Sequence, residues 1–288
     1  MSVQALDSAL LEERPKKRRR VRVRFVVASV IVAAYVLVAI FGPMFTHFNS
    51  NQTNILDRLL PPGGHGLVPG SHLLGTDQLG RDMLGELIQG ARISLVIGVA
   101  TIALSLVLGT VIGLVAGYLG SWVDGVLMRL ADVQLAFPSI ILAIFIAAAL
   151  GSSVLNVVIA LSLASWVIFA RISRAEALST RNRAYVEASR LLGAGKVRIM
   201  RKTILPIALR PLIIYATVQF GFVIVSEAAL SFLGVGVPAS DASWGTTIAN
   251  GESYLGSAWW ISTLPGIALA VLVVCMSIIG DDLNERLS

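Results

Sequence analysis

Six apolar runs, most of them about as long as a lipid bilayer is thick, constrain the fold of this 288-residue chain more than any other feature. A helix rises about 1.5 Å per residue, so about 20 residues cross a hydrocarbon core of about 30 Å. Backbone groups in that core cannot bond to water, which leaves helices or closed barrels as spanning structures. The runs lack the alternation of barrel strands, so we predict an all-α polytopic membrane protein with six transmembrane helices. The expected helices are Phe25–Phe45, Ile93–Leu119, Leu127–Leu150, Val154–Ala170, Leu212–Leu233 and Trp259–Ile279.

Lysine and arginine are distributed unevenly between the loops that join these runs. With the N-terminus placed inside, the inner segments hold 20 of the 23 basic residues. Cytoplasmic loops carry such an excess, so we predict that both termini and the segment 171–210 are cytoplasmic. The domain boundaries that follow are a basic tail at 1–24, a first helix at 25–45, an extracytoplasmic loop at 46–92, a five-helix core at 93–280 and a tail at 281–288.

The basic N-terminal tail allows two other interpretations. A cleaved signal peptide would have a shorter apolar core and a small-residue cleavage site, so we interpret 25–45 as an uncleaved anchor helix. A net charge of +6 could also indicate nucleic-acid binding. Topology already accounts for that charge, and we expect the tail to touch anionic lipid and not nucleic acid.

The sequence shows no motif for catalysis or for a bound cofactor. The nearest approach to a nucleotide-binding P-loop is Gly193–Val197, where Arg190 stands in place of the first glycine and Val197 in place of the magnesium-binding Ser/Thr. The lone Cys275 cannot form an internal disulfide. His47, His65 and His72 are scattered in one loop, without metal-ligand spacing. We therefore expect a non-catalytic chain that binds no cofactor or metal itself.

Two features lie inside the predicted helices. Gly109, Gly113 and Gly117 recur every fourth residue, on one helix face. Small residues there let another helix approach closely, so the stripe is interpreted as a packing seam, within the chain or between subunits. Glu227 is an acid within a membrane run. Such a residue is either a functional site, in a substrate pathway, or a buried hydrogen-bonding group that fixes helix packing, and the sequence leaves both open.

The segment 171–210 is a polar island between two apolar runs and carries ten Lys/Arg residues. Helix-forming residues fill Ala184–Leu192, Gly193 stands where a helix would stop, and Lys196–Ile204 can resume as a second short helix before Pro206. Its composition alone allows an amphipathic loop on anionic lipid. Apolar anchors at Tyr185, Leu191 and Leu192 also suit the groove of a soluble partner.

Particular residues of the island resemble a family motif. Glu187-Ala188-Ser189, then Gly193 and then Leu205-Pro206 are similar to the EAA loop of ABC importer permeases, with Ser189 in place of a second alanine and Thr203 in place of isoleucine. The runs Leu74–Asp82, Ser226–Gly234 and Gly280–Leu283 are similar to parts of the C-type permease of dipeptide and oligopeptide importers. Together these matches cover residues 20–285 in the expected order.

The resemblance implies a permease subunit of an ATP-driven importer in the bacterial inner membrane. It implies a pathway for short peptides shared with a second homologous permease, two ATPase subunits that bind ATP and Mg²⁺, and an outer substrate-binding protein. The implied ATPase-coupling residues are Tyr185, Glu187, Ala188, Ser189, Leu192, Gly193, Leu205 and Pro206. Two alternatives remain: the same architecture importing nickel or another small solute, and a stand-alone secondary transporter, which should show inverted repeats and several intramembrane acids.

Overall fold

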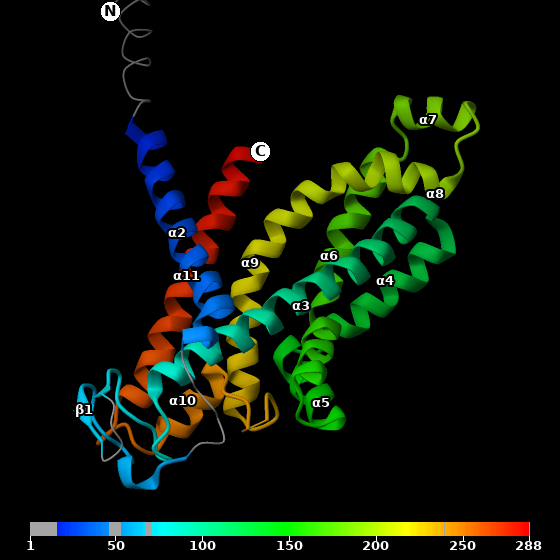
Figure 1. Cartoon of the computed structure of the whole chain (residues 1–288). Coiled ribbons are helices and arrows are strands. Elements are labelled where there is room, and N and C mark those ends of the chain that lie inside the picture. Colours follow the sequence, from blue (N-terminus) through cyan, green and yellow to red (C-terminus); the bar gives the residue numbers. More distant parts are fainter. Residues whose placement is uncertain (1–15, 46–52, 67–70, 239, 288) are drawn as a thin grey trace, which may run out of the picture.

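The computed structural model describes residues 16–45, 53–66, 71–238 and 240–287, and these form an almost entirely helical bundle. Figure 1 shows the first and last helices together at one side of the bundle. Two short strands, β1 (Gly64–His65) and β2 (Ser71–His72), make an antiparallel pair. The helices are α2 (Lys16–Phe45), η1 (Ile55–Asp57), α3 (Met83–Leu119), α4 (Ser121–Leu135), α5 (Ser139–Leu150), α6 (Val154–Thr180), α7 (Ala184–Leu191), α8 (Lys196–Ile199), the π-helical turn η2 (Met200–Ile204), α9 (Leu205–Phe232), α10 (Trp244–Glu252) and α11 (Trp260–Leu287).

Five helical segments of the described chain are long and apolar enough to cross a membrane, and the bent pair α4–α5 makes a sixth if it is counted as one span. The structure therefore agrees with the all-α prediction and gives five or six candidate spans, but the single helix expected at Leu127–Leu150 is wrong. That segment consists of two helices at 90° to one another. Pro138 stands at the break. Proline interrupts a helix because it lacks an N–H and its ring clashes with the preceding turn.

Most of the other helices extend beyond the expected bounds. The predicted basic tail 1–24 is helical from Lys16, α3 begins inside the expected loop 46–92, α6 and α9 take in both ends of the island 171–210, and the expected tail 281–288 continues α11. Charged side chains such as Lys, Arg and Glu are good helix formers, so a helix does not have to end where the apolar run does. The first fifteen residues and part of the 46–92 loop, with His47, lie outside the described residues.

The bundle has two distinct ends. The start of α2, the C-terminus of α11 and the pair α7–α8 lie at one end, which we call the α7 end (Figure 1). The pair β1–β2 and α10 lie at the opposite end, the α10 end (Figure 1). At the α7 end the guanidinium of Arg286 lies 4.3 Å from the ring centroid of Phe25, which joins the last helix to the first.

Helices α3 and α6 pack together along the glycine stripe. An added Cβ at Gly109 would lie 2.5 Å from the Cβ of Phe169, and one at Gly117 would lie 2.6 Å from the carbonyl oxygen of Arg174. A Cβ at Gly113 would overlap the Ala170 carbonyl and the Ser173 hydroxyl. Two serine hydroxyls of α6 also donate to carbonyl oxygens of α3, from Ser162 to Thr101 at 3.3 Å and from Ser173 to Gly109 at 3.3 Å. The stripe is thus a seam inside the chain.

Helix α4 is attached to α6 by polar contacts. Arg174 donates to both carboxylate oxygens of Asp124, at 2.5 and 2.6 Å. Arg171 donates to Asp132 at 2.7 Å. The amide of Gln134 lies between the indole of Trp166, which donates to it at 2.7 Å, and the Leu163 carbonyl, which accepts from it at 2.6 Å. These pairs align α4 antiparallel to α6.

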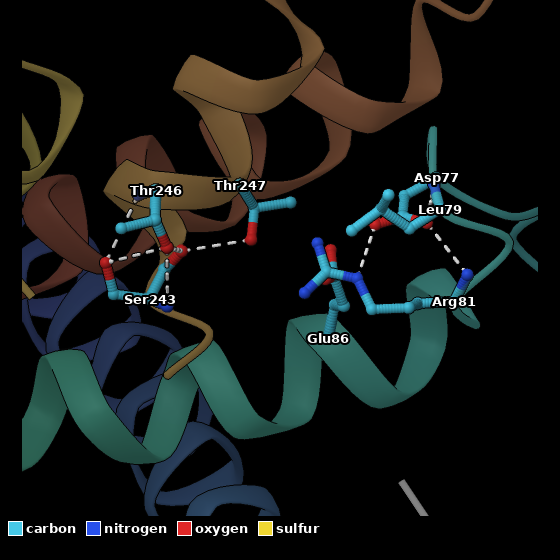
Figure 2. Close-up of polar contacts among 7 residues, drawn as sticks. All are labelled: Asp77, Leu79, Arg81, Glu86, Ser243, Thr246 and Thr247. Carbon is cyan, nitrogen blue, oxygen red and sulfur yellow. Dashed lines mark hydrogen bonds and ion pairs between the residues drawn. The ribbon is translucent and has the colours of Figure 1, made fainter. Parts of the chain in front are cut away.

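A buried ion cluster fixes the start of α3 at the α10 end. Arg81 donates to Asp77 at 2.6 Å and to Glu86 at 2.9 Å, and none of the three side chains is more than 5% exposed (Figure 2). The same Asp77 carboxylate accepts from the backbone N–H groups of Leu79 and Arg81. Asp82 then caps α3 by accepting from Gly85 at 3.0 Å. The run Leu74–Asp82 is therefore a folded cap rather than an extended loop.

Helix α10 was not expected from the sequence, where it fell in a loop. A reciprocal capping box between Ser243 and Thr246 starts it (Figure 2), which satisfies backbone donors that would otherwise be unpaired. Its first residue, Trp244, is buried and donates to the Leu87 carbonyl at 3.1 Å. The indole lies against Gly90, where a Cβ would come within 2.7 Å of it. Hence α10 is tied directly to α3.

Replacing Gly113 by alanine tests the α3–α6 seam. We expect Gly113→Ala to lower stability by about 1–3 kcal/mol, as overpacking of a tight contact does. Thermal unfolding of the purified protein in detergent measures this. The matched control is Gly125→Ala on α4, where no atom lies within 4 Å of the added carbon, so stability should stay equal or rise by about 0.5–1 kcal/mol. Equal Tm values for the two variants would contradict the seam.

Candidate functional site

The candidate site is the segment α7–α8, which joins α6 to α9 at the α7 end (Figure 1). Helix α7 ends in a Schellman motif: the N–H of Gly193 donates to the Arg190 carbonyl at 2.9 Å and the N–H of Ala194 donates to the Ser189 carbonyl at 3.0 Å. Gly193 has φ of +80°, a conformation that favours glycine. The chain then turns into α8, which continues through η2 into α9. The expected order of short helix, glycine break and short helix is what the structure has.

One face of this segment is anchored in the bundle. Val186 of α7 is fully buried, as are Ile199 and Ile204 of α8 and η2. They form one cluster with Leu114, Tyr118 and Ala177 of α3 and α6. Burying an apolar side chain of this size contributes about 1.5–3 kcal/mol, so the segment is held as a fixed body.

The opposite face carries large apolar side chains with no cover among the described residues. Leu191 is 85% exposed, Leu192 88%, Val197 71% and Tyr185 48%. We call these four residues the docking patch. Glu187 and Ala188 are exposed on the same short helix. Exposed apolar patches are common at interaction sites, so the four residues of the docking patch are a candidate contact surface.

The structure places the remaining predicted coupling residues in supporting positions. The hydroxyl of Ser189 donates to the Tyr185 carbonyl at 2.8 Å, within α7. Leu205 is half-buried against the anchoring cluster, and Pro206 lies in the first turn of α9, directly after the π-helical turn η2. Sequence reasoning missed Val186, whose burial depends on residues about 70 positions earlier in the chain.

The basic residues of the island serve different purposes. Four of the ten are used inside the fold: Arg171 and Arg174 pair with α4, Arg181 donates to the Gly117 carbonyl at 2.9 Å, and Arg190 stacks on Tyr118. The others are exposed: Arg183, Lys196, Arg198, Arg201, Lys202 and Arg210. The charge of the island is thus partly structural.

Glu227 lies far from this segment, in the part of α9 nearest the α10 end. Its carboxylate accepts from Ser94 of α3 at 3.0 Å and from Ser231 at 2.9 Å, and it is fully buried. Ser231 in turn accepts from the N–H of Val237 at 3.2 Å. The acid therefore links α3, α9 and the chain that leads to α10. This geometry matches the packing alternative for Glu227.

Side chains that could bind metal do not cluster in the described part of the chain, where no three His, Cys, Asp or Glu residues come together. His65 is exposed, whereas His72 lies 3.1 Å from the carboxylate of Asp82. A small recess with three serines, Ser139, Ser165 and Ser226, opens where α5, α6 and α9 meet.

The bundle and its α7–α8 segment define an ABC importer permease fold. A chain from an inward-facing structure of the MetNI methionine ABC transporter matches 72% of this chain and 98% of its own length, with a TM-score of 0.57 at 21% identity. A second crystal form of the same transporter gives a TM-score of 0.58 at 20% identity. At this identity the likeness concerns the fold.

The sequence itself matches the family model for binding-protein-dependent transport system inner membrane components over residues 109–288. Residues 20–62 match the N-terminal TM domain of oligopeptide transport permease C. The chain belongs to the family of binding-protein-dependent transport system inner membrane components. It is thus a multi-pass permease of the bacterial inner membrane.

Curated relatives share most of the chain. The di/tripeptide transport system permease protein of Pseudomonas aeruginosa is 40% identical over 88% of this chain and 83% of its own. The dipeptide transport system permease protein of Alkalihalophilus pseudofirmus is 37% identical over 91% of this chain and 84% of its own. The oligopeptide transport system permease protein of Bacillus subtilis is 36% identical, also over 91% and 84%.

Replacing Gly193 tests the turn that shapes the docking patch. A non-glycine residue in the left-handed region costs about 1–2 kcal/mol, so we expect Gly193→Ala to open α7 and raise its amide hydrogen exchange by about tenfold. Gly195→Ala is the matched control, because Gly195 has φ of −67° and nothing within 4 Å of its added carbon. Unchanged exchange in Gly193→Ala would show that the turn does not hold α7.

Proposed function

We propose that this chain is the permease subunit of an ATP-driven importer of short peptides. Membership of the family supports the importer function. The peptide substrate is supported by relatives that match more than four fifths of this chain and are named as dipeptide, di/tripeptide or oligopeptide permeases. Nickel or another small solute is the second candidate for the cargo. The three histidines do not decide between the two cargoes: in the described part of the chain His65 and His72 belong to no metal cluster, and His47 lies outside it.

The observation that carries the proposal is the docking patch on a firmly anchored helix. In our proposal the patch and Glu187 dock into a groove on an ATPase subunit, at the α7 end. ATP and Mg²⁺ are bound by two such ATPase subunits, and this chain itself is non-catalytic and holds no cofactor. A second, homologous permease completes the pathway, and a binding protein delivers the peptide at the α10 end.

This arrangement requires the α7 end to be cytoplasmic. Both ends of the described chain and the α7–α8 segment lie at that end (Figure 1), and the segments that the sequence assigns to the inside hold 20 of the 23 basic residues. Such an excess of positive charge is typical of the cytoplasmic side. Transport then consists of a population shift between states open to either side of the membrane.

Co-purification with the ATPase subunits tests the docking patch. Leu192→Asp, Glu187→Arg and Gly193→Pro should each weaken the association about tenfold or more, because charge or distortion in the centre of an interface removes a large part of the binding energy. Glu252→Arg, an exposed charge reversal at the α10 end, is the control and should bind normally. Full association of the three α7 variants would overturn the docking proposal.

Uptake by the complex reconstituted with its binding protein tests the cargo. We expect labelled di- and tripeptides to enter in an ATP-dependent manner and unlabelled peptide to compete, with no uptake of nickel ions. Peptide groups offer backbone donors and acceptors and charged termini that a binding protein can match. ATP-dependent nickel uptake that peptides leave unchanged would favour the second candidate.

A further inference from the structure

Helix α7 is connected to the bundle in two different ways. It is covalently continuous with α9 through α8 and η2, and with α6 through residues 181–183, so its movement reaches α9 and α6 directly. Its direct connection to α3 is made by side chains, because α3 ends at Leu119, more than 60 residues earlier. Movement of α7 therefore reaches α3 through those side chains and through the seam between α3 and α6.

The polar part of that connection is the contact between Arg190 and Tyr118. The guanidinium carbon of Arg190 lies 5.3 Å from the centroid of the Tyr118 ring, which is within cation–π range. The same guanidinium approaches the Tyr118 hydroxyl at 3.4 Å and donates to the Arg181 carbonyl at 3.1 Å. Tyr118 is only 9% exposed, so its ring is a fixed surface for the cation.

Arg181 extends the same contact to the end of α3. Its guanidinium donates to the Gly117 carbonyl at 2.9 Å, and a Cβ at Gly120 would lie 2.7 Å from one of its nitrogens. Gly117 is also the last member of the glycine seam with α6. Arg190, Tyr118, Arg181 and Gly117 therefore form one chain of contacts from α7 to α3.

Helix α3 runs from these contacts at its C-terminal end to the α10 end of the molecule. Its 37 residues span about 55 Å, and its first turns carry Glu86, bound to Arg81, and Gly90, packed on Trp244 of α10. A displacement of the α7 end of α3 is therefore delivered to the cap of the α10 end.

We propose that Arg190 and Tyr118 are positioning residues of the transport cycle, which couple displacement of α7 to α3 and through it to the α10 end. The inference rests on the proposed function, in which an ATPase displaces α7. Without the contact between Arg190 and Tyr118, α3 follows α7 only through the apolar cluster around Val186 and through its seam with α6, and so follows it less closely. Fewer peptides are then imported for each ATP that is hydrolysed.

The contact between Arg190 and Tyr118 is tested by measuring the number of peptides imported per ATP hydrolysed, which we call the transport ratio. In the reconstituted complex, Arg190→Gln and Tyr118→Leu should still associate with the ATPases and hydrolyse ATP, with the transport ratio lowered about twofold to fivefold, as loss of a cation–π contact predicts. Tyr118→Phe keeps the ring and should keep the ratio. The matched control is Arg183→Gln, which should behave as wild type, because Arg183 is an exposed arginine beside α7 that donates to the Ser179 carbonyl of α6 at 3.4 Å.

The double variant Tyr118→Leu/Arg190→Gln makes the test specific. If the two residues act through one contact, the double variant should lose no more than either single variant. A wild-type ratio in the single variants, or losses that multiply in the double variant, overturns the inference. If Tyr118→Leu fails to assemble, the exposed Arg190→Gln variant decides alone. Failure of the wild-type chain to bind ATPases would instead overturn the proposed function.

Discussion

Close packing of α3 against α6 is the interaction on which the other parts of the bundle depend. Lipid gives helices no hydrophobic reason to associate, so contact must come from close approach and interhelical hydrogen bonds. The glycines at 109, 113 and 117 allow that approach, and Ser162 and Ser173 add hydrogen bonds across it. Helix α4 attaches to the outer side of α6, and the α7–α8 segment packs over the end where α3 and α6 meet. The surface that we propose for docking is therefore positioned by a seam of small side chains.

The basic island shows how one property of a sequence can serve two purposes. Its positive charge is what indicates the cytoplasmic side. Four of its arginines also hold the helices together, since Arg171 and Arg174 pair with acids of α4 and Arg181 and Arg190 contact the end of α3. Ion pairs between exposed groups contribute little, but the bidentate Arg174–Asp124 pair is partly buried and fixes the direction of α4.

The sequence predicts what is local and misses what is distant. Length and hydropathy identify the crossings, and Gly193 marks the end of α7 because only that position requires positive φ there. The break at Pro138 was missed because apolar composition continues through it. Helix α10 was missed because it is short and because its first residue, Trp244, packs against Gly90, more than 150 positions earlier in the chain. In the sequence Arg190 is singled out only as the residue in place of the first P-loop glycine, and the folded chain shows its contact with Tyr118, 72 residues away.

The break between α4 and α5 has a consequence for what surrounds the protein. The carbonyls of Asp132, Val133 and Gln134 at the end of α4 accept from the N–H groups of Ala136 and Phe137, and the chain then turns by 90° at Pro138. Backbone that is not helical is found at membrane depth only where protein covers it or water reaches it. Counted as one crossing, the pair α4–α5 would therefore have protein or water, and not acyl chains, beside its corner.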